Sequence, residues 1–185
     1  MKGMVKIYTK MGDKGTSRLF TGEEVPKDSP YLKAYGCVDE LNSLLGVTLS
    51  FLDDKELTIL LTGFQNKLFQ LGSDLATPVD AKKSIARIEE KDVSALEKLI
   101  DKYEEELKPL KNFILPGGVP ASSYLQLART VCRRAEREST PLYNQGRMNP
   151  TVFKYLNRLS DLLFVLARVV NERKGVSETM WNATS

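Results

Sequence analysis

Residues Leu125–Glu138 read LQLARTVCRRAERE, and they set the pattern for the rest of the chain. Nothing in this stretch breaks a helix, and most of its residues favour one. At 3.6 residues per turn, the stretch separates into two faces. The first face is small and apolar and suits packing against other helices. It consists of Leu125, Ala128, Cys132 and Ala135.

The second face of this helix is a column of cations with one carboxylate among them. It consists of Arg129, Arg133, Glu136 and Arg137. Arginine stays charged and presents a planar fork of donors that fits phosphate oxygens. Charged helix faces are also commonly just solvated. The stretch alone therefore leaves two interpretations open, a solvated surface and an anion site.

The composition is that of an ordinary globular protein. The chain has 185 residues, of which 42% are hydrophobic and 28% charged, and we expect one domain over residues 1–185. The net charge of +3 is too balanced to predict general affinity for nucleic acid. No apolar run reaches the length of a membrane span, and the first ten residues do not resemble a secretory signal. We therefore expect neither a nucleic-acid partner nor a membrane.

Two residue types restrict the chemistry. Cys37 and Cys132 do not form a spaced pair, so we expect free buried thiols in a reducing compartment, the cytoplasm. The chain contains no histidine, which removes the usual general base and the commonest zinc ligand. An enzyme with this sequence would need little proton transfer from its side chains. No metal ligand set from the protein is expected.

The N-terminal residues 1–28 look like an anion-binding arm. Between Thr9 and Asp28 the sequence is rich in glycine, hydroxyl and cationic residues, and we expect no helix or buried strand there. Such residues can turn backbone amides and ammonium groups toward an anion. The stretch is not a Walker A loop or a dinucleotide fingerprint. A flexible arm without a ligand is the alternative.

From residue 29 to residue 175 the pattern is helical. Apolar residues at three- and four-residue spacing predict five helices and hence an all-α antiparallel bundle. The expected helices are Pro30 to about Phe51, Asp54–Ala76, Glu90–Leu107, Ala121–Thr140 and Pro150–Arg173. We expect a mobile connection over Val79–Glu89, a polar loop over Pro141–Met148 and a loosely held tail from Val176.

Two further positions each allow two interpretations. The turn KNFILPGGVP carries Phe113, which could plug the end of the bundle or form the aromatic wall of a ligand pocket. Asn157, on the last helix, could be a hydrogen-bonding group in the core or a ligand contact.

Five blocks, taken in order, are specific to one family. They are IYTKMGDKGTSRLFTG in the arm, VDELNSLLG, FILPGG, ARTVCRRAER and NRLSDLLFVLAR. Together they resemble the PduO-type cobalamin adenosyltransferases, which are ATP:corrinoid adenosyltransferases. The resemblance implies a five-helix bundle that assembles as a homotrimer with active sites between subunits. It also implies transfer of the 5′-deoxyadenosyl group of ATP to cob(I)alamin, assisted by Mg²⁺, with release of triphosphate and formation of adenosylcobalamin.

The resemblance also implies roles for particular residues. The residues implied in ATP binding are Thr9, Lys10, Met11, Gly12, Ser17, Arg18, Lys27, Arg133, Arg134, Ala135, Glu136, Arg137 and Asn157. Asp39 and Arg129 match a salt bridge across the subunit boundary. Phe113 matches the aromatic residue that lies against the corrin and keeps the lower axial ligand from cobalt. Arg129, Arg133, Asp39 and Phe113 are thus the implied catalytic set.

The chemistry of this reaction agrees with the residues present. Co(I) is the nucleophile and comes with the corrinoid, so the absence of histidine costs nothing. Arginine, lysine and a metal ion stabilise the negative charge that grows on the leaving triphosphate. Two positions depart from the family. Met11 stands where threonine is frequent, and Gln126 stands where histidine is frequent, which argues against a titrating group there.

Other functions remain as alternatives. The chain could be a non-catalytic module that binds ATP and corrinoid and delivers adenosylcobalamin to a cobalamin-dependent enzyme. A nucleic-acid-binding bundle would depend on the arginines alone, and their confinement to one arm and one helix face disfavours it. As an enzyme, the protein would also need a corrinoid reductase as partner.

Overall fold

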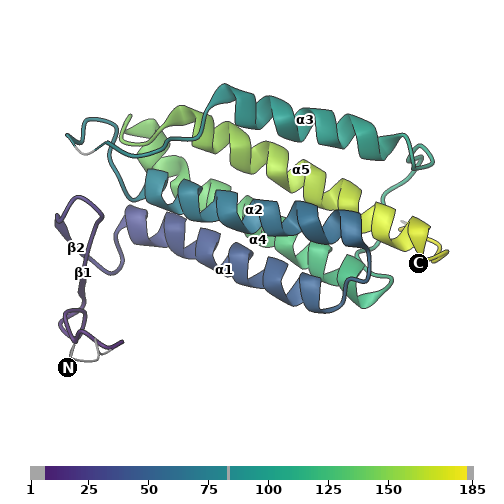
Figure 1. Cartoon of the computed structure of the whole chain (residues 1–185), viewed down its shortest axis with the longest axis horizontal. Helices are drawn as coiled ribbons and strands as arrows, with labels where there is room; N and C mark the ends of the chain where they lie inside the picture. Colours follow the sequence, from purple (N-terminus) through teal and green to yellow (C-terminus); the bar gives the residue numbers. More distant parts are fainter. Residues whose placement is uncertain (1–6, 83, 183–185) are drawn as a thin grey trace.

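The computed structural model describes residues 7–82 and 84–182, and within them a helix bundle follows a short hairpin (Figure 1). The predicted all-α bundle is confirmed. The elements in chain order are β1 (Thr16–Arg18), β2 (Glu24–Pro26), α1 (Pro30–Ser50), α2 (Lys55–Leu75), α3 (Glu90–Glu104), α4 (Pro120–Asn144) and α5 (Pro150–Arg173). None of the helices in these described ranges is both long and apolar enough to cross a membrane.

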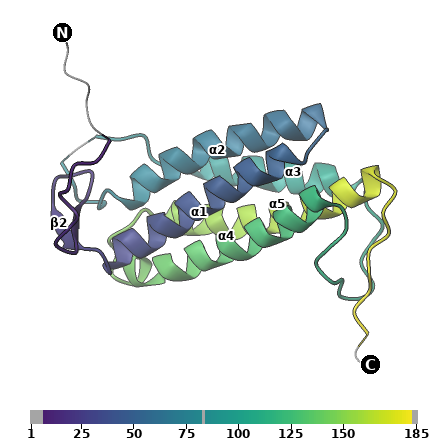
Figure 2. The same cartoon turned by 90° about the horizontal axis from the view of Figure 1, so that it is seen from below.

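The helix α4 lies between α1 and α5. The helix α1 also packs against α2, and α5 also packs against α3, so the order around the bundle is α2, α1, α4, α5, α3 (Figures 1 and 2). The apolar stripe predicted for α4 is confirmed, because Leu125, Ala128, Cys132 and Ala135 are fully buried. Neither cysteine forms a disulfide. Because the apolar stripe of α4 lies in the core, the charged face of this helix is directed away from it.

Polar residues cap the starts of three helices. The Ser29 hydroxyl accepts a hydrogen bond from the Leu32 amide at 3.4 Å, and Pro30 follows it at the first helical position. Asp54 caps α2, and Asn149 caps α5. These local signals explain why the starts of α1, α2 and α5 agree with the prediction.

The ends of two helices differ from the prediction. The helix α3 ends at Glu104 rather than Leu107, and α4 continues past Thr140 to Asn144. Pro141 cannot donate to the preceding turn, yet the helix persists. The residues after it have tertiary partners, since Leu142 is buried and the ring of Tyr143 lies 4.8 Å from that of Phe153. Tertiary packing has thus outweighed the helix-breaking effect of Pro141. The loop predicted over 141–148 therefore begins only after Asn144.

The N-terminal arm contains a hairpin that the sequence analysis did not predict. Strands β1 and β2 pair antiparallel, with Ser17 opposite Val25. Leu19 and Val25 are buried. The hairpin does not contradict the expectation of no buried strand, because Val25 alone of its strand residues is buried. Val25 and Leu19, which follows β1, join the core and hold the hairpin against the bundle.

The connection between α2 and α3 is anchored at Arg87 and Ile88, where the sequence predicted a mobile segment, and Lys83 of that segment lies outside the described residues. The Arg87 guanidinium donates to the fully buried Asp74 carboxylate at 2.6 Å and to the Thr77 carbonyl oxygen at 2.6 Å. Asp74 also accepts from the Ile88 amide and from the Asn149 side chain, each at 2.8 Å. One buried carboxylate thus ties the connection to the starts of α3 and α5.

The tail is also held over residues 176–182, where the sequence predicted a loose segment, and residues 183–185 of that prediction lie outside the described residues. It runs beside the loop that joins α3 to α4 (Figure 2). The Leu115 amide donates to the Thr179 carbonyl oxygen, and the Trp181 amide donates to the Phe113 carbonyl oxygen, both at 2.8 Å. The tail therefore supports the turn that carries Phe113.

The same turn is fixed to α5 through Asn171. The Asn171 side chain donates to the Gly117 carbonyl oxygen at 3.0 Å and accepts from the Val119 amide at 3.1 Å. Gly118 adopts φ 106°, and a Cβ there would lie 2.1 Å from the Asn171 amide oxygen. Only glycine fits this position without moving the asparagine.

We expect Gly118→Ala to lower the free energy of unfolding by about 2–4 kcal/mol, from left-handed backbone strain and displaced Asn171 hydrogen bonds. Urea denaturation measures the change. Gly117→Ala is the matched control, because a Cβ at Gly117 meets open space, and it should change stability little. Equal effects from the two substitutions would contradict this account of the turn.

Candidate functional site

The arginines of α4 occupy two different environments. Arg129 and Arg133 line a pocket of about 470 Å³ whose opposite wall includes Glu97 and Asp101 of α3. Arg134 instead forms an ion pair with Glu40 of α1. Arg137 donates to the Arg133 carbonyl oxygen at 3.1 Å. The charged face thus presents Arg129 and Arg133 to a pocket, while Arg134 bridges two helices.

Asn157 belongs to the polar face rather than the core. Its amide nitrogen donates to the Glu136 carboxylate at 3.1 Å, and its amide oxygen accepts from Arg158 at 2.8 Å. These contacts orient the asparagine beside the arginines of α4. The predicted grouping of Glu136 with Asn157 is therefore present within one chain. Ala135, in contrast, is fully buried, so its side chain lies in the core.

Arg129 is held by a neutral side chain. Its Nε donates to the amide oxygen of Gln126 at 2.9 Å, and its guanidinium lies 6.0 Å from the centre of the Phe164 ring. Burial, together with the charge of Arg133, lowers the pKa of Arg129 below its usual value. Because that usual value is far above neutrality, Arg129 remains a cation.

Phe113 forms the wall of a second, larger pocket. This pocket has a volume of about 890 Å³, and its lining includes Phe113, Gln126, Arg129, Phe164 and Trp181. Phe113 is 79% exposed, so it does not plug the bundle. Its ring meets that of Trp181 edge to face, with centroids 6.2 Å apart. The lining favours a large, flat ligand with an acceptor group near Arg129.

The arm brings several predicted residues together. A Cβ at Gly12 would lie 3.1 Å from the side-chain end of Lys27, so the lysine crosses the glycine closely. Lys10 adopts the left-handed φ of 60°, and the Thr9 hydroxyl accepts from the Met11 amide at 3.5 Å. The result is a tight, cationic turn.

The strand β1 carries the remaining predicted residues of the arm. Arg18 lies 3.6 Å from Glu24 across the hairpin, and this ion pair is exposed. Burial raises the pKa of Tyr35 on α1, and the neighbouring Ser17 side chain lowers it by less. Arg18 and Tyr35 line the same pocket, so the hairpin lies beside α1.

Within one chain, Asp39 and Arg129 do not meet. Asp39 lines a pocket of about 490 Å³ between α1 and α2, together with Arg18 of the arm. Arg129 lines the two pockets described above. No ion pair joins the two residues in the part of the chain that the structure describes.

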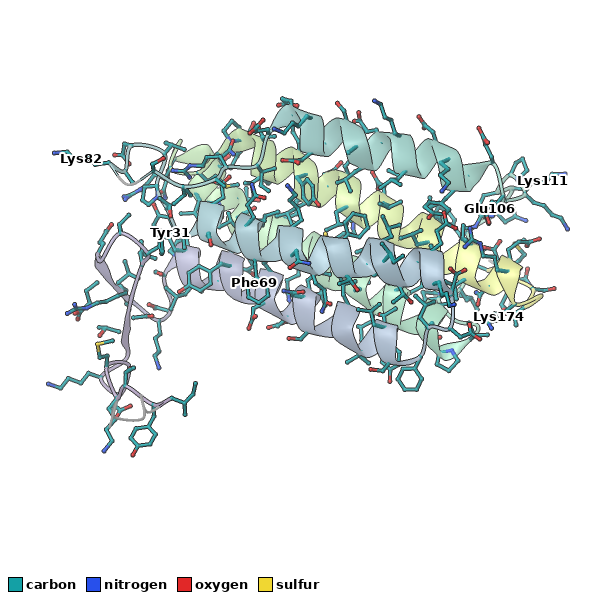
Figure 3. All side chains as sticks on the ribbon, in the orientation of Figure 1. Tyr31, Phe69, Lys82, Glu106, Lys111 and Lys174 are labelled. Carbon is teal, nitrogen blue, oxygen red and sulfur yellow. The ribbon has the colours of Figure 1, made fainter. Side chains whose placement is uncertain are left out.

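The arm and the Phe113 turn lie at opposite ends of the bundle. In Figure 3, Tyr31, which follows the arm, is at one end, and Lys111, two residues before Phe113, is at the other. The helix α1 has 21 residues and thus a length of about 30 Å. A single chain therefore does not bring these two groups to one ligand.

Some residues of the site were not identified as candidates from the sequence. Trp181 and Phe164 line the Phe113 pocket, and Gln126 positions Arg129. Phe164 lies on α5 one helical turn before Arg168, on a face that also carries Asn157. Trp181, the one tryptophan of the chain, stood in a tail expected to be loose. The presence of a large aromatic residue in the tail was the available signal.

Comparison with known proteins identifies the class to which this bundle and its cationic helix belong. The family model for cobalamin adenosyltransferases matches residues 7–170. The corrinoid adenosyltransferase of Bacillus subtilis (strain 168) is 43% identical over 185 residues, covering 98% of this chain and 94% of that protein. The corrinoid adenosyltransferase MMAB of Homo sapiens is 44% identical over 182 residues, covering 95% of this chain and 73% of that protein.

A solved structure gives the same result. A variant of the PduO-type ATP:corrinoid adenosyltransferase from Lactobacillus reuteri, complexed with cobalamin and ATP, superposes with a TM-score of 0.91 at 39% identity. The match covers 96% of this chain and 99% of that one. This chain belongs to the cobalamin adenosyltransferase family, so the family predicted from its five sequence blocks is confirmed.

Proposed function

We propose that this protein transfers the 5′-deoxyadenosyl group of ATP to the cobalt of cob(I)alamin, forming adenosylcobalamin and releasing triphosphate. The observation that carries the proposal is the position of Arg129. It lines both the pocket that it shares with Arg133 and the large aromatic-lined pocket. A phosphate-bearing substrate and a flat macrocycle could therefore meet at one guanidinium.

In this reaction the corrinoid supplies the electrons and the protein supplies charge. The bond that breaks joins C5′ of ATP to a triphosphate oxygen, and the bond that forms joins C5′ to cobalt. Arg133 and Arg137 would stabilise the negative charge that grows on the triphosphate. Mg²⁺ would arrive with the phosphates of the Mg–ATP substrate. The aromatic wall at Phe113 would keep water and the lower axial ligand from cobalt.

We propose that the active sites form between subunits of a homotrimer. Support comes from the separation of the arm and the Phe113 turn at opposite ends of one chain. The exposed Asp39 of one subunit would reach Arg129 of the next. The arm, with Thr9, Lys10, Met11, Gly12, Ser17, Arg18 and Lys27, would then cover the nucleotide held by the arginines of α4, with Asn157, of a neighbour.

We place the reaction in the cytoplasm, where a corrinoid reductase would supply cob(I)alamin. The free, buried thiols of Cys37 and Cys132 suit a reducing compartment. The product could be handed on to a cobalamin-dependent enzyme.

The direct test is to mix the protein with Mg–ATP and chemically reduced cobalamin. We expect a light-sensitive Co–C bond, followed by its absorbance, and triphosphate in equal amount. Samples without ATP provide the control. Binding of both ligands without turnover would instead support the delivery module, and binding of neither would reject both functions.

Arg133→Ala should lower kcat/KM for ATP by about 10–100-fold, the effect of losing a charge-assisted contact of roughly 1.5–3 kcal/mol. Steady-state kinetics at saturating corrinoid measure this. Lys91→Ala on α3, which removes an exposed cation paired with Glu89, is the control and should leave kcat/KM unchanged. Kinetics of Arg133→Ala equal to those of the control would reject the assigned role.

A double-mutant cycle tests the contact between subunits. Asp39→Asn and Arg129→Gln should each weaken assembly, and the pair should show a coupling free energy of at least about 1.5 kcal/mol, as for close interfacial charge pairs. Sedimentation equilibrium gives the assembly constants. Strictly additive effects would show that the two side chains do not meet.

A further inference from the structure

The C-terminal segment Val176–Asn182, which we term the C-terminal strap, forms one side of the Phe113 pocket. It runs antiparallel to the turn, with Met180 bridged to Ile114. Backbone hydrogen bonds at 2.8 Å flank this bridge on both sides. Trp181 of the strap lines the pocket opposite α4. The strap is thus part of the pocket wall rather than a free tail.

One buried guanidinium holds the strap. Arg168 of α5 is only 7% exposed, and its Nε donates to the Glu178 carboxylate at 2.6 Å. Its Nη2 donates to the second oxygen of Glu178 at 3.3 Å and to the carbonyl oxygen of Lys108 at 2.8 Å. Arg168 therefore joins α5, the loop that precedes Phe113 and the strap.

Each of the three tied segments carries one aromatic residue of the pocket. Phe164 lies one helical turn before Arg168 on α5. Phe113 follows Lys108 in the loop, and Trp181 follows Glu178 in the strap. All three rings line the pocket of about 890 Å³. Fixing the guanidinium therefore fixes the relative positions of the rings.

A buried ion pair at this place is a poor way to gain stability alone. Apolar residues of similar volume often stabilise a protein as well as a buried ion pair does. What the planar guanidinium provides instead is orientation. Its N–H groups point in fixed directions, so the carboxylate and the carbonyl oxygen must lie at fixed places around it. This arrangement sets the register of the strap against the turn.

We propose that Arg168 and Glu178 are positioning residues for the corrinoid, acting through the C-terminal strap on Phe113 and Trp181. This inference rests on the proposed function. It assigns no contact between either residue and a substrate. Its consequence is that breaking the pair should weaken use of the corrinoid while leaving use of ATP intact.

The test uses Glu178→Gln, which retains the shape of the side chain and removes its charge, and Arg168→Lys, which retains the charge and removes the fork. Each should raise KM for the corrinoid by at least about tenfold, the effect of one lost charge-assisted hydrogen bond. KM for ATP should not change. Asp53→Asn is the matched control, since it removes a carboxylate from an exposed ion pair with Lys174, just beyond α5.

Trp181, the one tryptophan of the chain, gives a readout that does not need activity. In both variants its emission should shift to the red and its quenching by acrylamide should increase, while Asp53→Asn matches the wild type. Thermal denaturation checks that the variants remain folded. Unchanged tryptophan emission, or equal rises in KM for ATP and corrinoid, would overturn the proposal. An inactive wild type would reject the proposed function, and the fluorescence comparison would still test the strap.

Discussion

The close packing of α4 between α1 and α5 is the constraint on which the site depends. Ala128, Cys132 and Ala135 have no exposed surface, and their small side chains let the neighbouring helices approach. Because a helix has a fixed period, burying this stripe leaves Arg129 and Arg133 no direction except outward. The same packing that stabilises the fold therefore aims the cations. The guanidinium groups are positioned by the core, and the triphosphate would meet donors that are already in place.

The Phe113 pocket beside this helix is lined partly by helices and partly by a loop and a tail that hydrogen bonds hold in place. The α4 wall contributes a cation oriented by an amide, Gln126. The opposite wall consists of loop and tail, which carry Phe113 and Trp181 and depend on hydrogen bonds to α5. Loops that carry function usually need such ties to a scaffold. In the proposed reaction, the protein provides shape and charge, and the corrinoid provides the nucleophile.

Patterns local in sequence predicted most of the bundle. The caps at Ser29, Asp54 and Asn149, and the apolar stripe of α4, follow from residues within one or two helical turns. What the sequence did not reveal depends on partners far along the chain. The helix continues past Pro141 because the ring of Tyr143 packs against that of Phe153, and the connection before α3 is anchored at Arg87 by its ion pair with Asp74. Within the candidate site, the residues of α4 were identifiable from spacing, whereas Trp181 is brought there by pairing with a turn 68 positions earlier.

The placement of the arm and the Phe113 turn at opposite ends of one chain has a genetic consequence in the proposed assembly. In that assembly each active site takes its arm from one subunit and its Phe113 turn from a neighbour. A mutation in the arm of a subunit therefore inactivates one site, and a mutation in its Phe113 turn inactivates another. In a mixed trimer the two faults can fall on the same site and leave a different site whole. Two defective alleles would then complement each other, and the partial recovery would depend on how the subunits are distributed. A single chain with both faults would not be rescued in this way.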